Sequence, residues 1–129
     1  MARTAITRRN LVPNGGLLAP TADTIDQANG MSLAITNTGV PAGPDMDMVI
    51  LKVDNSAAGA HNVIIRAGVN PPAFRAGLGD LTVSVTNGTT KYVGPFEPAR
   101  FKQADGSLNV DFDSGFSGTI TAFFMPGRW

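Results

Sequence analysis

Apolar and polar residues alternate along much of the chain from about residue 31 onward. In the segment 81–86 (LTVSVT), every second residue is leucine or valine, and the residues between them are threonine or serine. This period of two is typical of a β-strand with one buried face. The segments 31–35, 108–112 and 119–124 repeat the pattern and are predicted to be strands of the same kind.

Two further segments, 48–53 and 63–65, are more apolar than simple alternation requires. Such continuous runs are typical of strands that are covered on both faces, as in the centre of a sheet or under a subunit contact. Short segments at 91–93 and 99–102 bring the expected number of strands to about eight.

Turn signals separate these segments. Asn87-Gly88 lies between two strand patterns and predicts a tight hairpin, because both residue types accept the positive φ of a type I′ turn. Asp105-Gly106 and the segment 113–115 mark the next two reversals. We therefore expect an all-β fold: residues 21–129 would form a single antiparallel β-sandwich or a jelly-roll-like barrel.

The composition narrows the range of functions. The 129 residues include one histidine and no cysteine, which argues against a disulfide framework and against thiolate or multi-histidine metal sites, and we expect no cofactor. Ten Lys and Arg residues balance ten Asp and Glu residues, so the net charge is about zero. We therefore expect the protein to bind neither nucleic acid directly nor a membrane surface. Only 16% of residues are charged, which favours a surface that meets a protein partner. The start of the chain does not resemble a signal peptide, so we expect synthesis in the cytoplasm.

Residues 1–20 are predicted to form an extended, flexible basic arm. Arg3, Arg8 and Arg9 lie among apolar residues such as Ile6 and are followed by a Pro-Asn-Gly-Gly run. Such an arm can become ordered on a partner, adding a strand to a sheet edge while its arginines meet carboxylates. The alternative is a frayed terminus.

The longest irregular stretch of the body spans residues 67–80 and is a second candidate contact site. Within it, Asn70, Pro71, Pro72 and Phe74 are the residues expected to contact another subunit or a partner. Trp129, the last residue, either clips the tail to the body or packs on a neighbour, and both interpretations stay open.

Carboxylates offer the remaining candidate chemistry. If the protein were a small hydrolase, its catalytic carboxylates would come from Asp45 and Asp47 or from Asp111 and Asp113. The second pair also resembles half of a calcium-binding loop. The chain's one glutamate, Glu97, does not close that loop. We therefore expect these aspartates to be solvated or to begin turns.

Six short segments of the sequence are distinctive: 1–7 (MARTAIT), 14–16 (NGG), 67–72 (AGVNPP), 79–83 (GDLTV), 93–96 (VGPF) and 118–123 (GTITAF). With these segments the chain resembles small proteins encoded among the head genes of tailed phages and prophages of actinobacteria. The segments are turn and strand phrases spread over nearly the whole chain, and they contain no catalytic signature.

The resemblance implies a virion structural protein, and specifically a capsid decoration protein on the outer surface of the head. Such proteins commonly form homotrimers at local three-fold positions, with an N-terminal arm that reaches onto the major capsid protein. On this interpretation Arg3, Ile6, Arg8 and Arg9 would contact the capsid. The segment 70–74 and Trp129 would then contact the capsid or the other subunits of the trimer.

A different class of function is also compatible with a small β-sandwich. The chain could be a carbohydrate- or receptor-binding module of a phage tail or fibre, which would need exposed aromatic side chains. Tyr92 and Trp129 are the candidates that the sequence offers.

Overall fold

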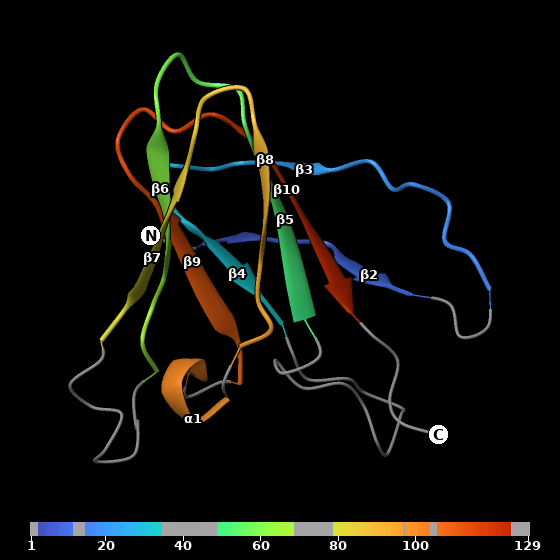
Figure 1. Cartoon of the computed structure of the whole chain (residues 1–129). Coiled ribbons are helices and arrows are strands. Elements are labelled where there is room, and N and C mark those ends of the chain that lie inside the picture. The colour runs from blue at the N-terminus through green and yellow to red at the C-terminus, as the bar shows by residue number, and fades with distance from the viewer. Residues whose placement is uncertain are drawn as a thin grey trace.

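Ten strands and one short helix make up the computed structural model, which describes residues 3–11, 15–34, 49–68, 79–96, 98–103 and 106–124 (Figure 1). The elements are β1 (Thr4–Ala5), β2 (Arg8–Asn10), β3 (Asp23–Thr24), β4 (Met31–Leu33), β5 (Val49–Asn55), β6 (His61–Ile65), β7 (Leu81–Val85), β8 (Thr90–Val93), α1 (Pro98–Phe101), β9 (Leu108–Phe112) and β10 (Gly118–Phe124).

The strands form two sheets that pack face to face. The first sheet has the order β1-β4-β9-β6-β7, and the second has the order β2-β10-β5-β8 with β3 also paired to β10. The described strands do not close into a barrel, so the all-β prediction is confirmed as a sandwich. The completely buried side chains come from both sheets, and include Met31, Leu33, Leu51, Val63, Ile65, Leu108, Ile120 and Phe124.

The alternation of apolar and polar residues along the strands determines which side chains enter this core. In β5 every second residue is buried and the residues between them are half-buried. This strand lies between β10 and β8, and β6 lies between β9 and β7. The two segments that were most apolar in the sequence are therefore internal strands, as predicted.

The N-terminal segment corrects the expectation of a flexible arm over residues 3–11. Strand β1 pairs in parallel with β4, and β2 pairs in parallel with β10, so one short stretch of chain joins both sheets. Ile6, between these strands, is only 4% exposed and its N–H donates to the Ser32 carbonyl oxygen over 2.8 Å. The two parallel pairs make both sheets mixed, where an antiparallel sandwich was expected.

Strand β3 brings the chain back to the same side of the sandwich. It pairs with β10 near residues 119 and 120, next to the part of β10 that pairs with β2. Ile25 follows β3 and is buried in the core. Two crossings of the chain, each with a buried isoleucine, therefore cover the side where β4 and β10 would otherwise have unpaired edges.

One predicted strand, 99–102, is a correction of a different kind, because part of it forms the helical turn α1. Pro98 is the first residue of α1, a position where its fixed φ suits a helix and its missing N–H costs nothing. Phe101 ends the turn, is buried, and meets Phe96 edge to face with ring centroids 5.9 Å apart. The turn therefore covers the end of the core with an aromatic side chain.

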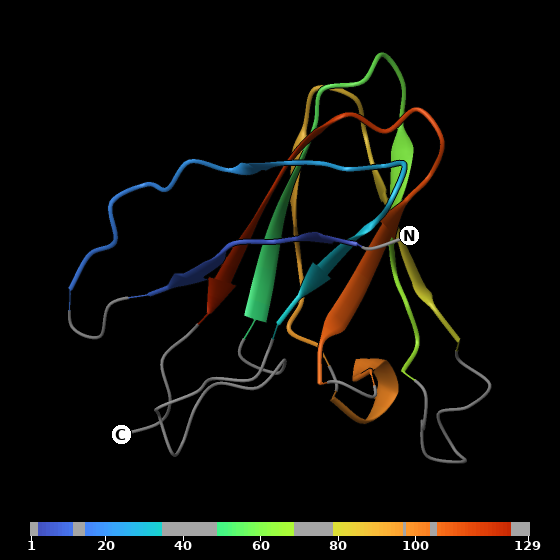
Figure 2. The same ribbon diagram turned by 180° about the vertical axis from the view of Figure 1, so that it is seen from behind.

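The turn at Asn87-Gly88 is present, but the strands on either side of it do not form the predicted hairpin. Strand β7 pairs with β6 in one sheet, and β8 pairs with β5 in the other. The buried Asn55 holds this connection between sheets, since its carbonyl oxygen accepts from Gly88 N–H and its own N–H donates to the Thr89 carbonyl oxygen. Figure 2 shows this turn beside the loops that follow β5 and β9, all at one end of the sandwich.

Candidate functional site

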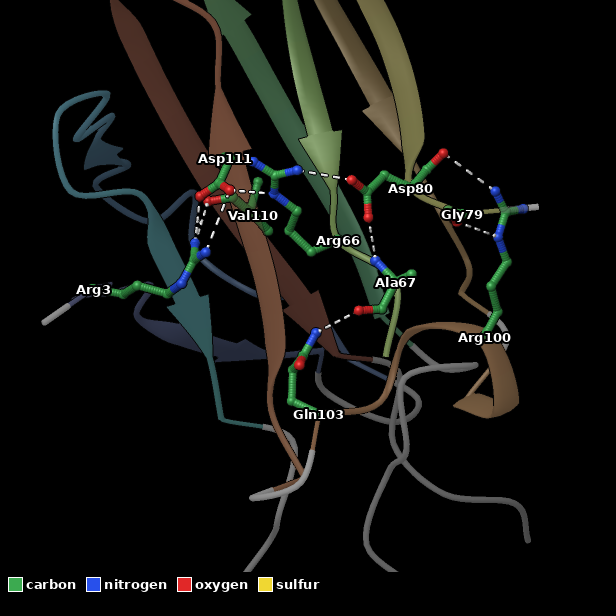
Figure 3. Close-up of polar contacts among 9 residues, drawn as sticks. All are labelled: Arg3, Arg66, Ala67, Gly79, Asp80, Arg100, Gln103, Val110 and Asp111. Carbon is green, nitrogen blue, oxygen red and sulfur yellow. Dashed lines mark hydrogen bonds and ion pairs between the residues drawn. The ribbon is translucent and has the colours of Figure 1, made fainter. Parts of the chain in front are cut away.

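Arg3, the first of the expected partner-contact residues, is engaged within the fold. Its guanidinium contacts both carboxylate oxygens of Asp111 on β9, with Nη2 3.3 Å from Oδ2. Nη1 also lies 3.4 Å from the carbonyl oxygens of Met31 and of Val110. Figure 3 shows this arginine reaching across the edge of the first sheet toward β9.

Asp111 is the centre of a row of alternating charges that crosses the first sheet (Figure 3). Its other partner is Arg66, the residue after β6, and Arg66 Nη1 lies 2.8 Å from Oδ2 of Asp80, the residue before β7. Asp80 also accepts a hydrogen bond of 2.6 Å from the Ala67 N–H. We call Arg3, Asp111, Arg66 and Asp80 the charge row.

The pKa shifts follow from these contacts. Burial opposes ionisation of Asp111, but hydrogen bonds from Arg3 and Arg66 outweigh it, so the pKa of Asp111 lies below its usual value. The hydrogen bond from the Ala67 N–H, with help from Arg66, lowers the pKa of Asp80. Hydrogen bonds to Asp111 and Asp80 raise the pKa of Arg66. Asp111, Asp80 and Arg66 are therefore ionised near neutral pH, and the contacts of the charge row connect neighbouring strands of the first sheet.

The other residues of the expected arm contact also make contacts within the fold. Ile6 is in the core and is unavailable to a partner. The Arg8 guanidinium lies 4.2 Å from the centroid of the buried Phe124 ring, its Nε donates to Asn10 Oδ1, and burial lowers its pKa. Arg9 Nη2 donates to the Thr21 carbonyl oxygen over 2.9 Å.

The expected contact residues Asn70, Pro71, Pro72, Phe74 and Trp129 lie outside the described residues. So do Asp45 and Asp47, the first candidate carboxylate pair.

The second carboxylate pair is divided between two structural roles. Asp111 belongs to the charge row, whereas Asp113 Oδ1 lies 2.7 Å from His61 Nδ1 and Asp113 Oδ2 accepts from the Asn62 N–H over 2.9 Å. Within the described part of the chain, no three His, Cys, Asp or Glu side chains gather as metal ligands would. The contacts of Asp113 fix the reversal after β9, as expected for an aspartate that begins a turn.

A groove of about 320 Å³ lies on the outer face of the second sheet. Its floor comes from β10, β5 and the edge strand β8, and its wall from the chain between β2 and β3. The lining residues are Leu11, Leu17, Ala19, Pro20, Ala22, Lys52, Tyr92, Thr121 and Phe123.

Strand register explains why these side chains meet. Lys52 on β5 is directly opposite Thr121 on β10 and Tyr92 on β8, so the three form one row across the sheet. Phe123, two residues further along β10, points to the same face. The Tyr92 side chain is well exposed, which leaves one side of the groove open.

Comparisons of the chain with protein-family models, with curated protein sequences and with solved structures gave no match. Among the described residues, no helix has the length and apolar character needed to cross a membrane.

The sequence interpretation singled out Tyr92 but missed the other residues of the groove. The one signal was the adjacent pair Leu17-Leu18, which lies between Gly15-Gly16 and Pro20. Successive side chains of an extended segment point in opposite directions, so two neighbouring apolar residues cannot both face the core. Such a pair therefore indicates an exposed apolar position. The floor residues gave no signal in the sequence. An outward-facing strand residue can be recognised as part of a groove only when the residues beside it on the neighbouring strands are known.

Proposed function

We propose that this protein is a non-enzymatic structural component of a phage head, a decoration protein that binds the outer shell and stabilises it. The observation that carries the proposal is the groove face of the second sheet, where the sandwich presents apolar side chains to solvent. Small monomeric proteins seldom leave such side chains gathered on one face unless it contacts a partner. The resemblance to phage head proteins makes the major capsid protein the partner of choice.

The proposed mechanism is mechanical. Packaged DNA exerts pressure on the shell, and a bound protein that spans neighbouring capsid subunits adds contact area where they meet. A homotrimer at a local three-fold position would engage three equivalent surfaces at once, so that individually modest contacts add to a strong attachment. The protein would be made in the host cytoplasm and would reside on the outer surface of the virion.

Co-sedimentation with phage heads tests this function. Purified protein is mixed with expanded heads that lack it, and the bound fraction is measured over a range of protein concentrations. We expect saturation at a fixed ratio to the capsid subunit, and that ratio reports whether three-fold positions are filled. Absence of binding at micromolar protein would overturn the proposal.

A second candidate, a carbohydrate-binding module of a tail or fibre, is favoured by one feature. The exposed ring of Tyr92 stands beside Lys52 and Thr121 in the groove, and an aromatic face with polar neighbours suits a sugar ring. A glycan panel probed with the wild-type protein and with Tyr92→Ala tests it. Binding that depends on Tyr92, without any binding to heads, would replace the decoration proposal.

A further inference from the structure

The exposed apolar side chains of this protein are concentrated, not scattered. In the described part of the chain the large apolar residues left exposed are Leu11, Leu17, Leu18 and Tyr92. Three of them line the groove, and Leu18, which is 91% exposed, lies in sequence between two lining residues. Single exposed apolar residues are ordinary, but a group that meets at one hollow indicates a contact surface.

The wall of this groove is built by a segment that turns its leucines outward. Residues 15–19 are all exposed, and the segment stands away from the body beside β2 and β3 in both views (Figures 1 and 2). The hydrogen bond from Arg9 to the Thr21 carbonyl oxygen ties the far end of the segment to β2. The segment is thus joined to β2 at one end, and Leu17 and Leu18 are exposed and available to a partner.

The charge on the groove is positive. Lys52 lines its floor, and within the described residues its ammonium has no hydrogen bond and no ion pair. The nearest acid along β5 is Asp54, whose two carboxylate oxygens accept hydrogen bonds from the Thr90 and Thr119 hydroxyls. Among the residues that the structure describes, the carboxylate on this face is thus already partnered and the lysine has no partner.

We infer that the groove binds an extended peptide segment that presents apolar side chains and a carboxylate. The apolar side chains would pack against Leu11, Leu17 and Tyr92, and the carboxylate would meet Lys52 Nζ. The volume of about 320 Å³ lies near the lower end of the range of about 300–1,000 Å³ seen for ligand pockets, so it suits one or two side chains. This inference rests on the proposed function, and it places the segment in the shell protein.

Charge complementarity favours this occupant over a second copy of the chain. Two copies docked through the same face would bring Lys52 toward its own equivalent. Asp54, the described carboxylate on this face, is held by two hydroxyls and would have to leave them to compensate. A foreign acidic segment meets neither obstacle.

The test compares variants in the co-sedimentation assay with heads that lack the protein. Lys52→Gln removes the charge but keeps most of the side chain, and the double variant Leu17→Ser with Leu18→Ser removes the apolar wall. Lys91→Gln is the matched control, because it makes the same change of charge on β8 while its Nζ contacts the Ser84 carbonyl oxygen, away from the groove residues. We expect the first two to weaken binding about tenfold or more, and the control to stay within about twofold of wild type.

The outcomes separate the two proposals. If wild type and all variants bind heads equally, the groove inference is overturned while the decoration function stands. If wild type does not bind at all, the decoration function is overturned, and a direct titration then decides the groove. In that titration, amide shifts of the labelled protein are followed with two synthetic peptides of equal leucine content, one with glutamates and one with lysines between the leucines. Shifts at Lys52, Tyr92 and Phe123 with the glutamate peptide alone support the groove; equal or absent shifts overturn it.

Sedimentation of the free protein covers the remaining occupant. If the double leucine variant turns an oligomer into a monomer while Lys52→Gln binds heads normally, the face binds a second copy. That result would overturn the inference.

Discussion

The side-chain amide of Asn55, at the end of β5, donates a hydrogen bond of 2.8 Å to the carbonyl oxygen of Val85, at the end of β7. These strands belong to different sheets, so this bond joins the two layers. Asn55 is almost completely buried, and its side chain also donates to the Gly59 carbonyl oxygen and accepts from the Ala57 N–H. A single buried amide therefore organises the end of the sandwich.

Asn55→Ala should lower the free energy of unfolding by about 2–4 kcal/mol, because three hydrogen bonds are lost and the Val85 carbonyl oxygen is left buried without this donor. Urea denaturation measures the change. Asn62→Ala is the control, since no described contact involves the Asn62 side chain amide, and it should change stability by about 0.5 kcal/mol or less. Equal losses in both variants would contradict this role of Asn55.

Ile6→Ala should destabilise the fold by about 2–5 kcal/mol, the range for removing a buried aliphatic side chain. The reason is that Ile6 packs in the core between the two sheets. Thermal unfolding reads the effect, and Leu18→Ala, at an exposed position, should leave the midpoint nearly unchanged. Deleting residues 1–12 should be at least as harmful as Ile6→Ala. A truncated protein as stable as wild type would show that β1 and β2 contribute nothing to the fold.

The charge row should make stability depend on pH and salt. Because the pKa of Asp111 is lowered in the folded state, its contribution is complete above its unfolded pKa of about 4 and disappears as the pH falls through the folded value. We expect Asp111→Asn to cost about 1–2 kcal/mol at pH 7, a modest value because Arg66 is partly exposed to water. Denaturation curves from pH 7 to pH 3 should show the difference from wild type shrinking toward the acid end.

Salt distinguishes this effect from a packing defect. The loss in Asp111→Asn should shrink at high ionic strength, since ion pairs near the surface are screened. Asp54→Asn serves as the comparison, because Asp54 accepts from threonine hydroxyls and its loss should be insensitive to salt. A loss in Asp111→Asn that is constant with both pH and salt would exclude an electrostatic role.

Gly118→Ala should be among the most harmful small substitutions in the chain, at about 3 kcal/mol or more. Gly118 has a φ of 145°, and a Cβ there would lie 1.9 Å from the Asp54 carbonyl oxygen in the neighbouring strand. Gly16→Ala is the control: nothing lies within 4 Å of its Cβ position, and we expect it to be neutral or slightly stabilising. Chemical denaturation of the two variants side by side checks this, and similar stabilities would be inconsistent with the close approach of β10 to β5.

The strands that could be predicted from the sequence are those with one face toward the core and the other toward solvent. Segment 81–86 shows its alternation without knowledge of its neighbours, and it is a strand in the structure. Segment 99–102 is too short to distinguish a strand from a helical turn, and Pro98 and the burial of Phe101 decide it. The pairing of Arg8–Asn10 with β10 could not be predicted, because it depends on a contact between residues more than a hundred positions apart.

The candidate functional residues also depend on contacts that the sequence does not show. The arginines near the N-terminus suggested a partner contact, yet Arg3 is used within the fold because Asp111 lies opposite it on β9. Lys52 gave no signal as part of a strand, and it matters only because β8, β10 and the segment 15–22 surround it.

The central position of β10 affects how the protein can fold during its synthesis on the ribosome. This strand, near the end of the sequence, lies between β2, near its beginning, and β5. Vectorial synthesis therefore delivers the partners of β10 long before β10 itself, and the second sheet cannot be completed until residue 124 has been made. Until then β2 and β5 lack the strand that lies between them, and their apolar side chains stay exposed, which favours association with chaperones.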